Sequence, residues 1–302
     1  MRGFYGLDEK KNYFEGFYFK QTSEKSTVAV IPALHADQSG RRFASIQVIT
    51  DDVSGFVRFP MERFEAGENR FFFRIGKCVF RENGLEMSLR TNALDVSGRL
   101  VFGPFETLSS PIMGPFEYIP KMQCRHRVVS MCHSVFGTLS VNGKRFVYDD
   151  ALGYIEGDRG SSFPSRYLWT HYAHKKENLS LMLSVADIPF LRTKFTGILC
   201  PILFCGKEYR LATYRGAKLA FIGDNTICIK QGAFSLTVKL ISENARLLRA
   251  PHNGAMERHI HESPSCTVQY IFKKGAETLF DVIGENASLE CEYPEFKTKN
   301  YS

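Results

Sequence analysis

Two acids near the middle of the chain have a spacing that suits proton transfer. Glu156 and Asp158 are two residues apart, so on an extended strand both side chains would point to the same side. Two carboxyls in one cavity can share a proton, or one can be kept neutral, which would make the pair an acid and a base. A salt bridge from either acid to Arg159 or Arg166 explains the same residues equally well.

These acids belong to a segment of unusual composition, residues 153–169, with the sequence GYIEGDRGSSFPSRYLW. The segment contains three glycines, a proline and Trp169, the only tryptophan of the chain. Glycines beside carboxylates and rings suggest a backbone that bends tightly to aim particular side chains. We therefore expect strands to lead into this segment and away from it. Trp169 fits a core position as well as a ligand platform, because aromatic rings serve both roles.

Histidines and cysteines supply further candidates. His133 and His171 could donate protons near neutral pH, although a buried or surface histidine with an ordinary structural role is the more frequent case. Cys124, His126 and Cys132 are separated by even numbers of residues along one predicted strand, so their side chains could point to the same side. They lack the paired spacing that is typical of zinc sites, so we predict no metal site and no cofactor.

The elements that must position these residues are strands. Aromatic and β-branched runs alternate with turn signals along the whole chain, and no segment keeps a helical period. This pattern is typical of an all-β sandwich or barrel, and a barrel of about eight strands can hold one small ligand. The main expected strands are 12–22, 27–34, 42–50, 70–75, 77–81, 85–90, 94–101, 124–141, 179–185, 195–204, 209–214, 218–222, 226–230, 235–241, 266–272 and 277–282.

Turn residues give the expected connections. Asn83-Gly84 and Asn142-Gly143 are Asn-Gly pairs, which supply the positive φ angles of tight hairpins. Residues 103–120 contain four prolines, which argues against a long helix or a central strand there. We take this segment as the crossing between two β halves, 1–118 and 119–302.

The composition of the chain limits the classes of binding partner that we expect. The net charge is +7, but the basic residues are scattered among acids, so we expect no nucleic-acid binding. Contact with an anionic membrane surface is compatible with this charge. The longest largely apolar run, 195–205, is too short to cross a bilayer, and we expect no signal peptide because residues 1–11 are polar and charged. Eight cysteines in such a chain are expected to be reduced thiols, and we expect a cytoplasmic protein.

Several blocks also resemble the motifs of one family. YFEGFYFK at 13–20 is similar to its opening signature YFEGWYFK, and IMGPF at 112–116, SMCH at 130–133 and GTLSVNG at 137–143 follow in order. The segment 153–169 resembles the family's GYxExxWGxxFPxxWxW motif, and SVADIP, ATY, RAP and HES match later blocks. On these motifs the chain resembles the tocopherol cyclase-like proteins, in a bacterial form, over residues 13–290.

The resemblance implies a lipocalin-like, calycin-type fold in two β halves. It also implies an apolar ligand, because the family's founding reaction closes a ring on a prenylated quinol without a cofactor. That reaction needs an acid in an apolar pocket, aromatic faces for a developing cation and exclusion of water. Residue types and resemblance together select catalytic candidates Glu156, Asp158 and His171, and ligand-binding candidates Glu15, Tyr18, His133, Tyr154, Arg159, Tyr167 and Trp169.

The departures from the family pattern leave the reaction open. Arg159 replaces a tryptophan, Gly157 a lysine and Tyr167 another tryptophan, while His171 and Ala173 replace a glutamine and an asparagine. An arginine facing the pocket would repel a carbocation, or would bind an anionic group of a different substrate. We therefore carry three readings: a cofactor-independent cyclase, hydratase or isomerase; a non-catalytic carrier or sensor; and a structural protein whose cavity is filled by its own side chains.

Overall fold

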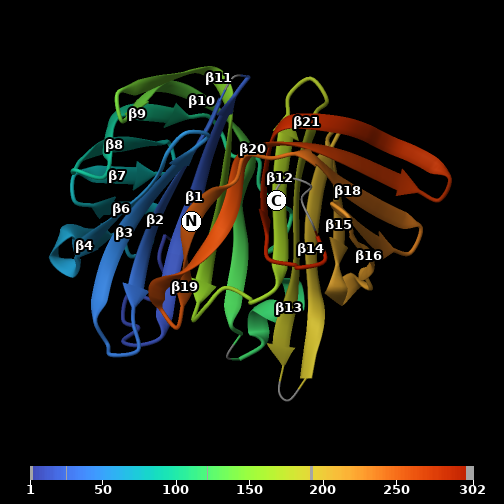
Figure 1. Ribbon diagram of the computed structural model, residues 1–302, viewed down its shortest axis with the longest axis horizontal. Helices are drawn as coiled ribbons and strands as arrows, with labels where there is room; N and C mark the ends of the chain where they lie inside the picture. Colours follow the sequence, from blue (N-terminus) through green and yellow to red (C-terminus); the bar gives the residue numbers. More distant parts are fainter. Residues whose placement is uncertain (1–2, 25, 121, 191–192, 297–302) are drawn as a thin grey trace. The chain divides into compact units, whose positions relative to one another are not determined.

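The protein is built almost entirely of antiparallel strands. The computed structural model describes residues 3–24, 26–120, 122–190 and 193–296 (Figure 1). The regular elements in these ranges are strands and three short 3-10 helices, η1 (Met61–Arg63), η2 (Gly114–Tyr118) and η3 (Thr213–Arg215). This confirms the predicted all-β class. In the described ranges, no helix has the length and apolar character that crossing a membrane would require.

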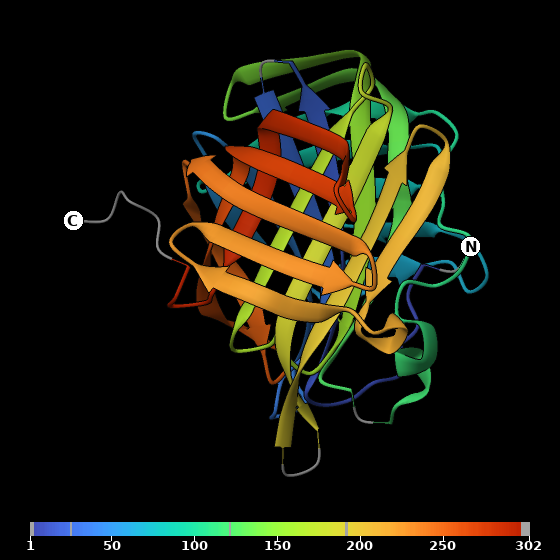
Figure 2. The ribbon, with the colours of Figure 1, turned by 90° about the vertical axis from the view of Figure 1, so that its right-hand side faces the viewer.

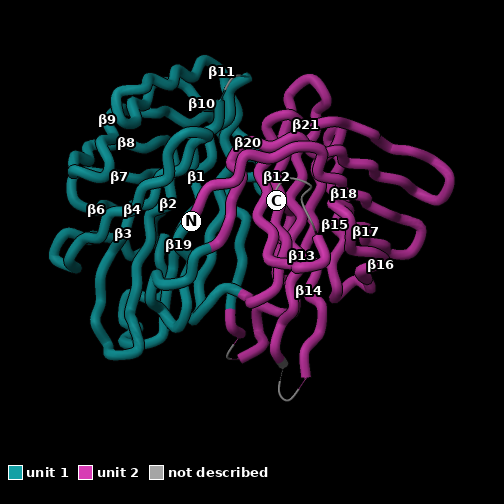
Figure 3. The backbone as a smooth tube through the Cα atoms, in the orientation of Figure 1, with its two compact units in different colours: residues 1–107, 124–163, 248–259 teal, residues 108–123, 164–247, 260–302 magenta. Residues whose placement is uncertain are grey.

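The chain forms two compact units, coloured separately in Figure 3. Unit 1 contains residues 1–107, 124–163 and 248–259, and unit 2 contains 108–123, 164–247 and 260–302. These units differ from the predicted halves 1–118 and 119–302. Residues 124–163 supply two strands to the sheet of unit 1, and Gln47 exchanges two hydrogen bonds with the backbone of Arg249, at 2.8 and 3.0 Å. Long-range pairing of this kind leaves no local signal in the sequence.

Unit 1 is one antiparallel sheet that curls into a nearly closed barrel. Its strand order is β4-β3-β2-β1-β11-β10-β9-β8-β7-β6-β5. The strands are β1 (Tyr13–Ser23), β2 (Ser26–Ala36), β3 (Arg42–Thr50), β4 (Ser54–Pro60), β5 (Phe64–Ala66), β6 (Phe72–Ile75), β7 (Cys78–Arg81), β8 (Gly84–Arg90), β9 (Asp95–Phe102), β10 (Cys124–Val141) and β11 (Lys144–Gly160).

Phenylalanines fill the middle of this barrel. Phe17 and Phe19 of β1 point inward because strand side chains alternate between two faces, and they meet Phe73 of β6 and Phe80 of β7. Phe4, fully buried, packs edge-on against Phe17 and Phe73 at 5.3 and 5.0 Å between ring centroids. Such edge-to-face contacts stabilise beyond their buried area. The abundance of phenylalanine in unit 1 therefore reflects core packing.

Unit 2 has its own sheet and its own core. The strand order is β15-β14-β13-β12-β21-β20-β18-β17-β16, and β19 also pairs with β20; Figure 2 shows these strands in yellow to red. The strands of this sheet are β12 (Tyr167–His174), β13 (Leu179–Phe190), β14 (Thr193–Phe204), β15 (Lys207–Ala212), β16 (Lys218–Gly223), β17 (Thr226–Gln231), β18 (Phe234–Ser242), β19 (Arg246–His252), β20 (Ala255–Lys274) and β21 (Glu277–Cys291). Most of β19 and the first residues of β20, 248–259, belong to unit 1. Alternate residues such as Leu168, Tyr172 and Tyr270 point into the core.

The two Asn-Gly pairs behave differently. Asn142 and Gly143 form the β10–β11 turn with φ values of 49° and 83°, as predicted. The other prediction is wrong in detail: Arg81 pairs with Gly84, so the turn residues are Glu82 and Asn83. Gly84 lies in β8 with φ 151°, where a Cβ atom would meet the Leu100 carbonyl oxygen at 2.2 Å. Gly84 is thus required by a close backbone approach.

The glycines of the segment 153–169 also have a different role from the one expected. Residues 153–160 continue β11 as a strand, so the predicted tight bend is absent there. A Cβ on Gly157 would lie 3.0 Å from the Gly16 carbonyl oxygen and 3.1 Å from the Phe17 ring. A Cβ on Gly153 would lie 2.1 Å from His133 Nε2. These glycines make room for groups of the neighbouring strands.

Gly153→Ala is therefore expected to destabilise the protein by roughly 1–3 kcal/mol, the usual cost of overpacking. The His133 ring cannot move aside, because Ser130 bonds its Nδ1 at 2.9 Å and Phe102 and Phe105 pack against it. Urea unfolding of Gly153→Ala, His133→Ala and the double variant measures the coupling free energy between the two positions. An equal cost of Gly153→Ala in both backgrounds would show that the His133 ring is not the obstacle.

Candidate functional site

One face of the β1–β11 pair in unit 1 is polar although it is buried. Tyr18 lies opposite Glu156 and Lys20 lies opposite Tyr154 in the strand register, with Asp158 next along β11. Residues opposite one another share a face of the sheet, and this face is the one opposite to the phenylalanine core. Lys20 is 1 % exposed and Glu156 is 5 % exposed. We call this set, with His126 of β10, the acid face.

His126 bridges the two acids. Its Nδ1 lies 2.9 Å from Asp158 Oδ1 and its Nε2 lies 3.2 Å from Glu156 Oε2. The register explains the contact, because β10 places His126 directly opposite Asp158. Cys124 adds a hydrogen bond from Sγ to Asp158 Oδ1 at 3.4 Å. Parity thus predicted the common side of Glu156 and Asp158 correctly.

The ionic partner of the acids differs from the alternative drawn from the sequence. Both acids contact His126. Arg159 belongs to the opposite face of β11 and lies over the Tyr5 ring, 4.4 Å from its centroid. Arg166 belongs to unit 2, where it pairs with Asp187 at 3.2 Å and Glu295 at 2.7 Å. The cationic partner of Glu156 and Asp158 is therefore the imidazole of His126, and not an arginine side chain as the sequence alternative suggested.

Two groups of the acid face, His126 and Tyr154, have raised pKa values and so keep their protons near neutral pH. Burial acts to lower the pKa of His126, but the charges of Asp158 and Glu156 and their hydrogen bonds outweigh it and raise that pKa well above its usual value. Tyr154 donates a hydrogen bond from its hydroxyl to Glu156 Oε2 at 2.5 Å. Burial and the nearby Glu156 charge raise the pKa of Tyr154 well above its usual value. An imidazolium and a phenol thus both present protons to Glu156.

The same three residues also have the composition of a metal site. His126, Glu156 and Asp158 each offer one ligand atom, and these atoms lie within 4.8 Å of one another. A metal ligand would be a neutral imidazole with one bare nitrogen. Here both ring nitrogens of His126 face carboxylate oxygens, which favours an imidazolium that neutralises the acids over a metal ligand.

His133 lies on the inner face of β10, apart from the acid face. It pairs in register with Gly153 and its ring contacts Phe102 and Phe105 at 4.7 and 4.9 Å between centroids. Burial lowers the pKa of His133 to about 3. Ser130 donates its hydroxyl proton to the Cys132 carbonyl at 2.9 Å, so its oxygen accepts from His133 Nδ1. The ring is therefore neutral near pH 7 and unsuited to the proton-donor role considered from the sequence.

The two histidines should differ clearly in ¹⁵N NMR spectra at pH 7. We expect His126 to carry protons on both ring nitrogens, because two carboxylates stabilise its cation. We expect His133 to be neutral with its proton on Nδ1 from pH 5 to pH 8, because burial disfavours its cation. His126→Gln and His133→Gln assign the signals. A neutral His126 at pH 7 would contradict the bridging imidazolium.

Glu15 and Arg159 share the inner face at one end of β1 and β11, opposite each other in register. Glu15 Oε2 accepts hydrogen bonds from the Tyr5 and Gly6 amides at 2.8 and 2.9 Å and from the Tyr13 hydroxyl at 2.9 Å. These bonds attach the N-terminal segment to the barrel. Of the two ligand-binding candidates predicted in β1, Glu15 therefore lies on the inner face and only Tyr18 lies on the acid face.

The remaining predicted residues lie together in unit 2. Tyr167, Trp169 and His171 alternate along β12 with core residues, and the Trp169 and His171 rings are stacked 6.5 Å apart. Tyr167 donates its hydroxyl to Glu290 Oε2 at 2.7 Å. Glu262, fully buried, lies opposite Glu290 in the register of β20 and β21. Unit 2 therefore carries a buried acidic and aromatic cluster of its own.

Sequence reasoning missed four of these polar residues. Lys20 is two residues after Tyr18 in the YFEGFYFK block, so the strand period places both on one face. His126 is two residues after Cys124, and the sequence suggested it only as a metal ligand. Glu262 lies in the HES block at 261–263. Glu290 had no motif, and only its pairing with Trp169 and Glu262 reveals it.

Comparisons with known proteins place the fold. No protein-family model matches the sequence, and no curated protein sequence matches it. Two solved structures are similar over nearly the whole chain. One is a Nitrosomonas europaea protein provisionally assigned as AttH, with 9 % identity, a TM-score of 0.56 and coverage of 96 % of this chain and 95 % of that one. The other is kievitone hydratase from Nectria haematococca, with 10 % identity, a TM-score of 0.54 and coverage of 97 % and 94 %.

These similarities define the class of protein by its fold. The chain has a lipocalin-like β-barrel fold, which it shares with the two neighbours, and it divides into two β units. At identities of 9 % and 10 % the similarity concerns the fold alone. The function has to be argued from the residues of the site.

Proposed function

We propose that the protein is a cofactor-independent acid–base catalyst of the tocopherol cyclase-like kind. Its substrate would be an apolar, prenylated small molecule, and the reaction would be cyclisation, hydration or isomerisation started by protonation of an alkene. The observation that carries the proposal is the buried His126 held between Glu156 and Asp158, with Tyr154 bonded to Glu156. Buried, mutually coupled proton donors and acceptors are typical of catalytic sites.

The acid face has the groups that this chemistry needs. A proton passes from the His126, Glu156 and Tyr154 network to one alkene carbon, and a cation forms at the more substituted carbon. A hydroxyl of the substrate or a water molecule then adds to the cation and returns a proton to a carboxylate. The rings of Tyr18 and Tyr154 can stabilise a nearby cation through their faces, and the carboxylates offset its charge.

Three further observations support the proposal. Arg159, which replaces a tryptophan of the family pattern, lies on the other face of β11 over Tyr5, so it does not oppose a cation next to Glu156. One of the proteins that shares the fold is a hydratase by name. The ordered sequence blocks add the resemblance to the tocopherol cyclase-like proteins.

The test is turnover in D₂O. Purified protein is incubated with a set of prenylated quinols and prenylated phenols, and products are analysed by mass spectrometry and NMR. We expect a product that carries one non-exchangeable deuterium at the alkene carbon that receives the proton. Retention of unchanged ligand without deuterium, by a protein shown to bind it, would contradict catalysis.

A non-catalytic carrier or sensor of the same kind of ligand is the second candidate. The departures at Gly157, Tyr167, His171 and Ala173 favour it, because the family pattern has other residues there. Native mass spectrometry of gently purified protein, followed by solvent extraction, decides between the two. A carrier keeps its ligand unchanged through purification and incubation, whereas an enzyme converts the extracted compound when it is added back.

A further inference from the structure

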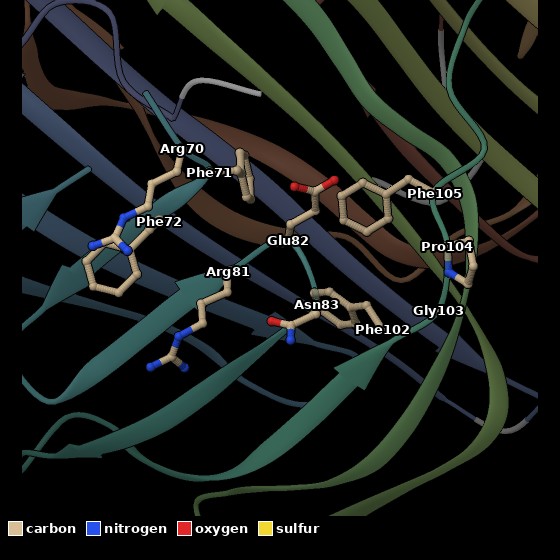
Figure 4. Close-up of a pocket in the computed structure, with 10 residues that line it drawn as sticks. All are labelled: Arg70, Phe71, Phe72, Arg81, Glu82, Asn83, Phe102, Gly103, Pro104 and Phe105. Carbon is tan, nitrogen blue, oxygen red and sulfur yellow. The ribbon is translucent and has the colours of Figure 1, made fainter. Parts of the chain in front are cut away.

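A separate pocket opens at one end of the unit 1 barrel, between β6, β7 and the end of β9. Its volume is about 800 Å³, within the range of small-molecule sites. Four rings contribute to its lining, those of Phe71, Phe72, Phe102 and Phe105 (Figure 4). The rings of Phe102 and Phe105 both pack on His133, at 4.7 and 4.9 Å between centroids. The aromatic part of the pocket, Phe71, Phe102 and Phe105, is therefore held in place by packing, and Phe71 and Phe102 are only 4 % and 6 % exposed.

Glu82 is exposed to solvent, and its side chain is directed toward this aromatic part. Figure 4 shows its carboxylate between the rings of Phe71 and Phe105. Within the described part of the chain, the Glu82 carboxylate has neither a hydrogen bond nor an ion pair. It belongs to the two-residue turn that joins β7 to β8, so the hairpin places its backbone at the edge of the pocket. A carboxylate without a partner thus faces aromatic rings at the mouth of a pocket.

The two arginines of the lining are directed elsewhere. The guanidinium groups of Arg70 and Arg81 lie over the Phe72 ring, 4.6 and 5.8 Å from its centroid. Arg81 also pairs with Glu86 at 3.3 Å. Figure 4 shows both groups on the Phe72 side of the pocket, away from the Glu82 carboxylate. The ring of Phe72 is therefore already used to bind cations, while no arginine neutralises Glu82.

We propose that this pocket binds an organic cation with an alkylammonium group, held by Phe71, Phe102 and Phe105 and paired with Glu82. Aromatic faces attract ammonium groups, and several rings around one cation are the usual recognition device for quaternary ammonium ligands. The carboxylate adds the opposite charge. His133 beside the rings is neutral near pH 7, because burial lowers its pKa to about 3, so it does not repel the ligand.

This site is independent of the proposed function. The pocket is lined by residues at the ends of β6, β7 and β9 and in the segment that follows β9, and none of these residues belongs to the acid face. Variants of the pocket therefore leave the acid face unchanged, and the two proposals can fail separately.

The test compares choline with its uncharged carbon analogue, 3,3-dimethylbutan-1-ol, by NMR titration of the full chain. We expect choline to bind at least roughly tenfold more tightly, since the two molecules differ mainly in charge. Glu82→Gln should remove this preference, and Phe105→Leu should weaken choline binding while leaving the Glu82 charge in place. Glu62→Gln, an exposed glutamate in η1, is the matched control and should keep the preference.

Three results would overturn the proposal. The first is equal affinity for the two probes, or no binding of choline at millimolar concentration. The second is an unchanged preference in Glu82→Gln, provided that its amide spectrum shows the native fold. The third is tighter binding of propionate than of choline, with loss of that binding in Arg70→Gln, which would assign the pocket to an anion.

Discussion

Replacing Glu156 by glutamine is expected to lower the rate of proton transfer to the substrate by roughly 10²–10⁴-fold, the usual contribution of a positioned acid or base. The glutamine amide oxygen can still accept the hydrogen bond that the Tyr154 hydroxyl donates to Glu156 at 2.5 Å in the wild-type protein. It can neither take up nor release a proton in the reaction. Asp158→Asn should also reduce turnover, because it removes the other carboxylate that holds the His126 cation. The measurement is the initial rate of deuterium incorporation from D₂O.

The controls separate loss of chemistry from loss of structure. Glu62→Gln makes the same change at an exposed position and should leave the rate unchanged. Thermal unfolding should show that Glu156→Gln remains folded, since an isosteric amide keeps the packing. Wild-type rates in both Glu156→Gln and Asp158→Asn would remove these acids from the mechanism.

Replacing His126 by leucine is expected to have the largest effect on stability. The substitution removes the cation between Glu156 and Asp158 and leaves two largely buried carboxylates close together. Breaking a buried ion pair by removing one partner costs roughly 3–5 kcal/mol. Urea unfolding at pH 6 should show a loss of this order. His252→Leu replaces an exposed histidine and should change the free energy of unfolding by less than about 0.5 kcal/mol.

The contribution of His126 should also depend on pH with a definite sign. Its pKa in the folded protein is raised above the value of the unfolded chain, which is about 6.5. Its contribution is therefore fully present below pH 6.5, where both states bind the proton. It decreases above pH 6.5, where the unfolded chain loses the proton first, and it is lost as the pH rises through the pKa of the folded state.

The difference in unfolding free energy between wild type and His126→Gln should accordingly shrink from pH 6 to pH 9. The same series with His252→Gln corrects for an ordinary exposed histidine. A difference that grows with pH would mean that His126 is neutral in the folded state, and would revive the reading of His126 as a metal ligand.

Local sequence patterns were sufficient for the fold class and for most strands. Alternation and turn residues placed β1, β3 and β10 close to their observed bounds, because the two-residue period of a strand is a local property. The same period placed Glu156 and Asp158 on one side of β11. The Asn142-Gly143 turn was predictable for a local reason too, since these residues tolerate positive φ.

Pairing between distant segments decided the rest. The register of β10 against β11 brings His126 to Asp158 across thirty-two positions, and the register of β20 against β21 brings Glu262 to Glu290. The division into units follows from such pairings as well, because 124–163 joins the sheet begun by residues 13–102. The sequence by itself determined which side chains share a face of each strand. Only the tertiary structure decided which strands lie side by side, because strand registers depend on contacts that local periodicity does not encode.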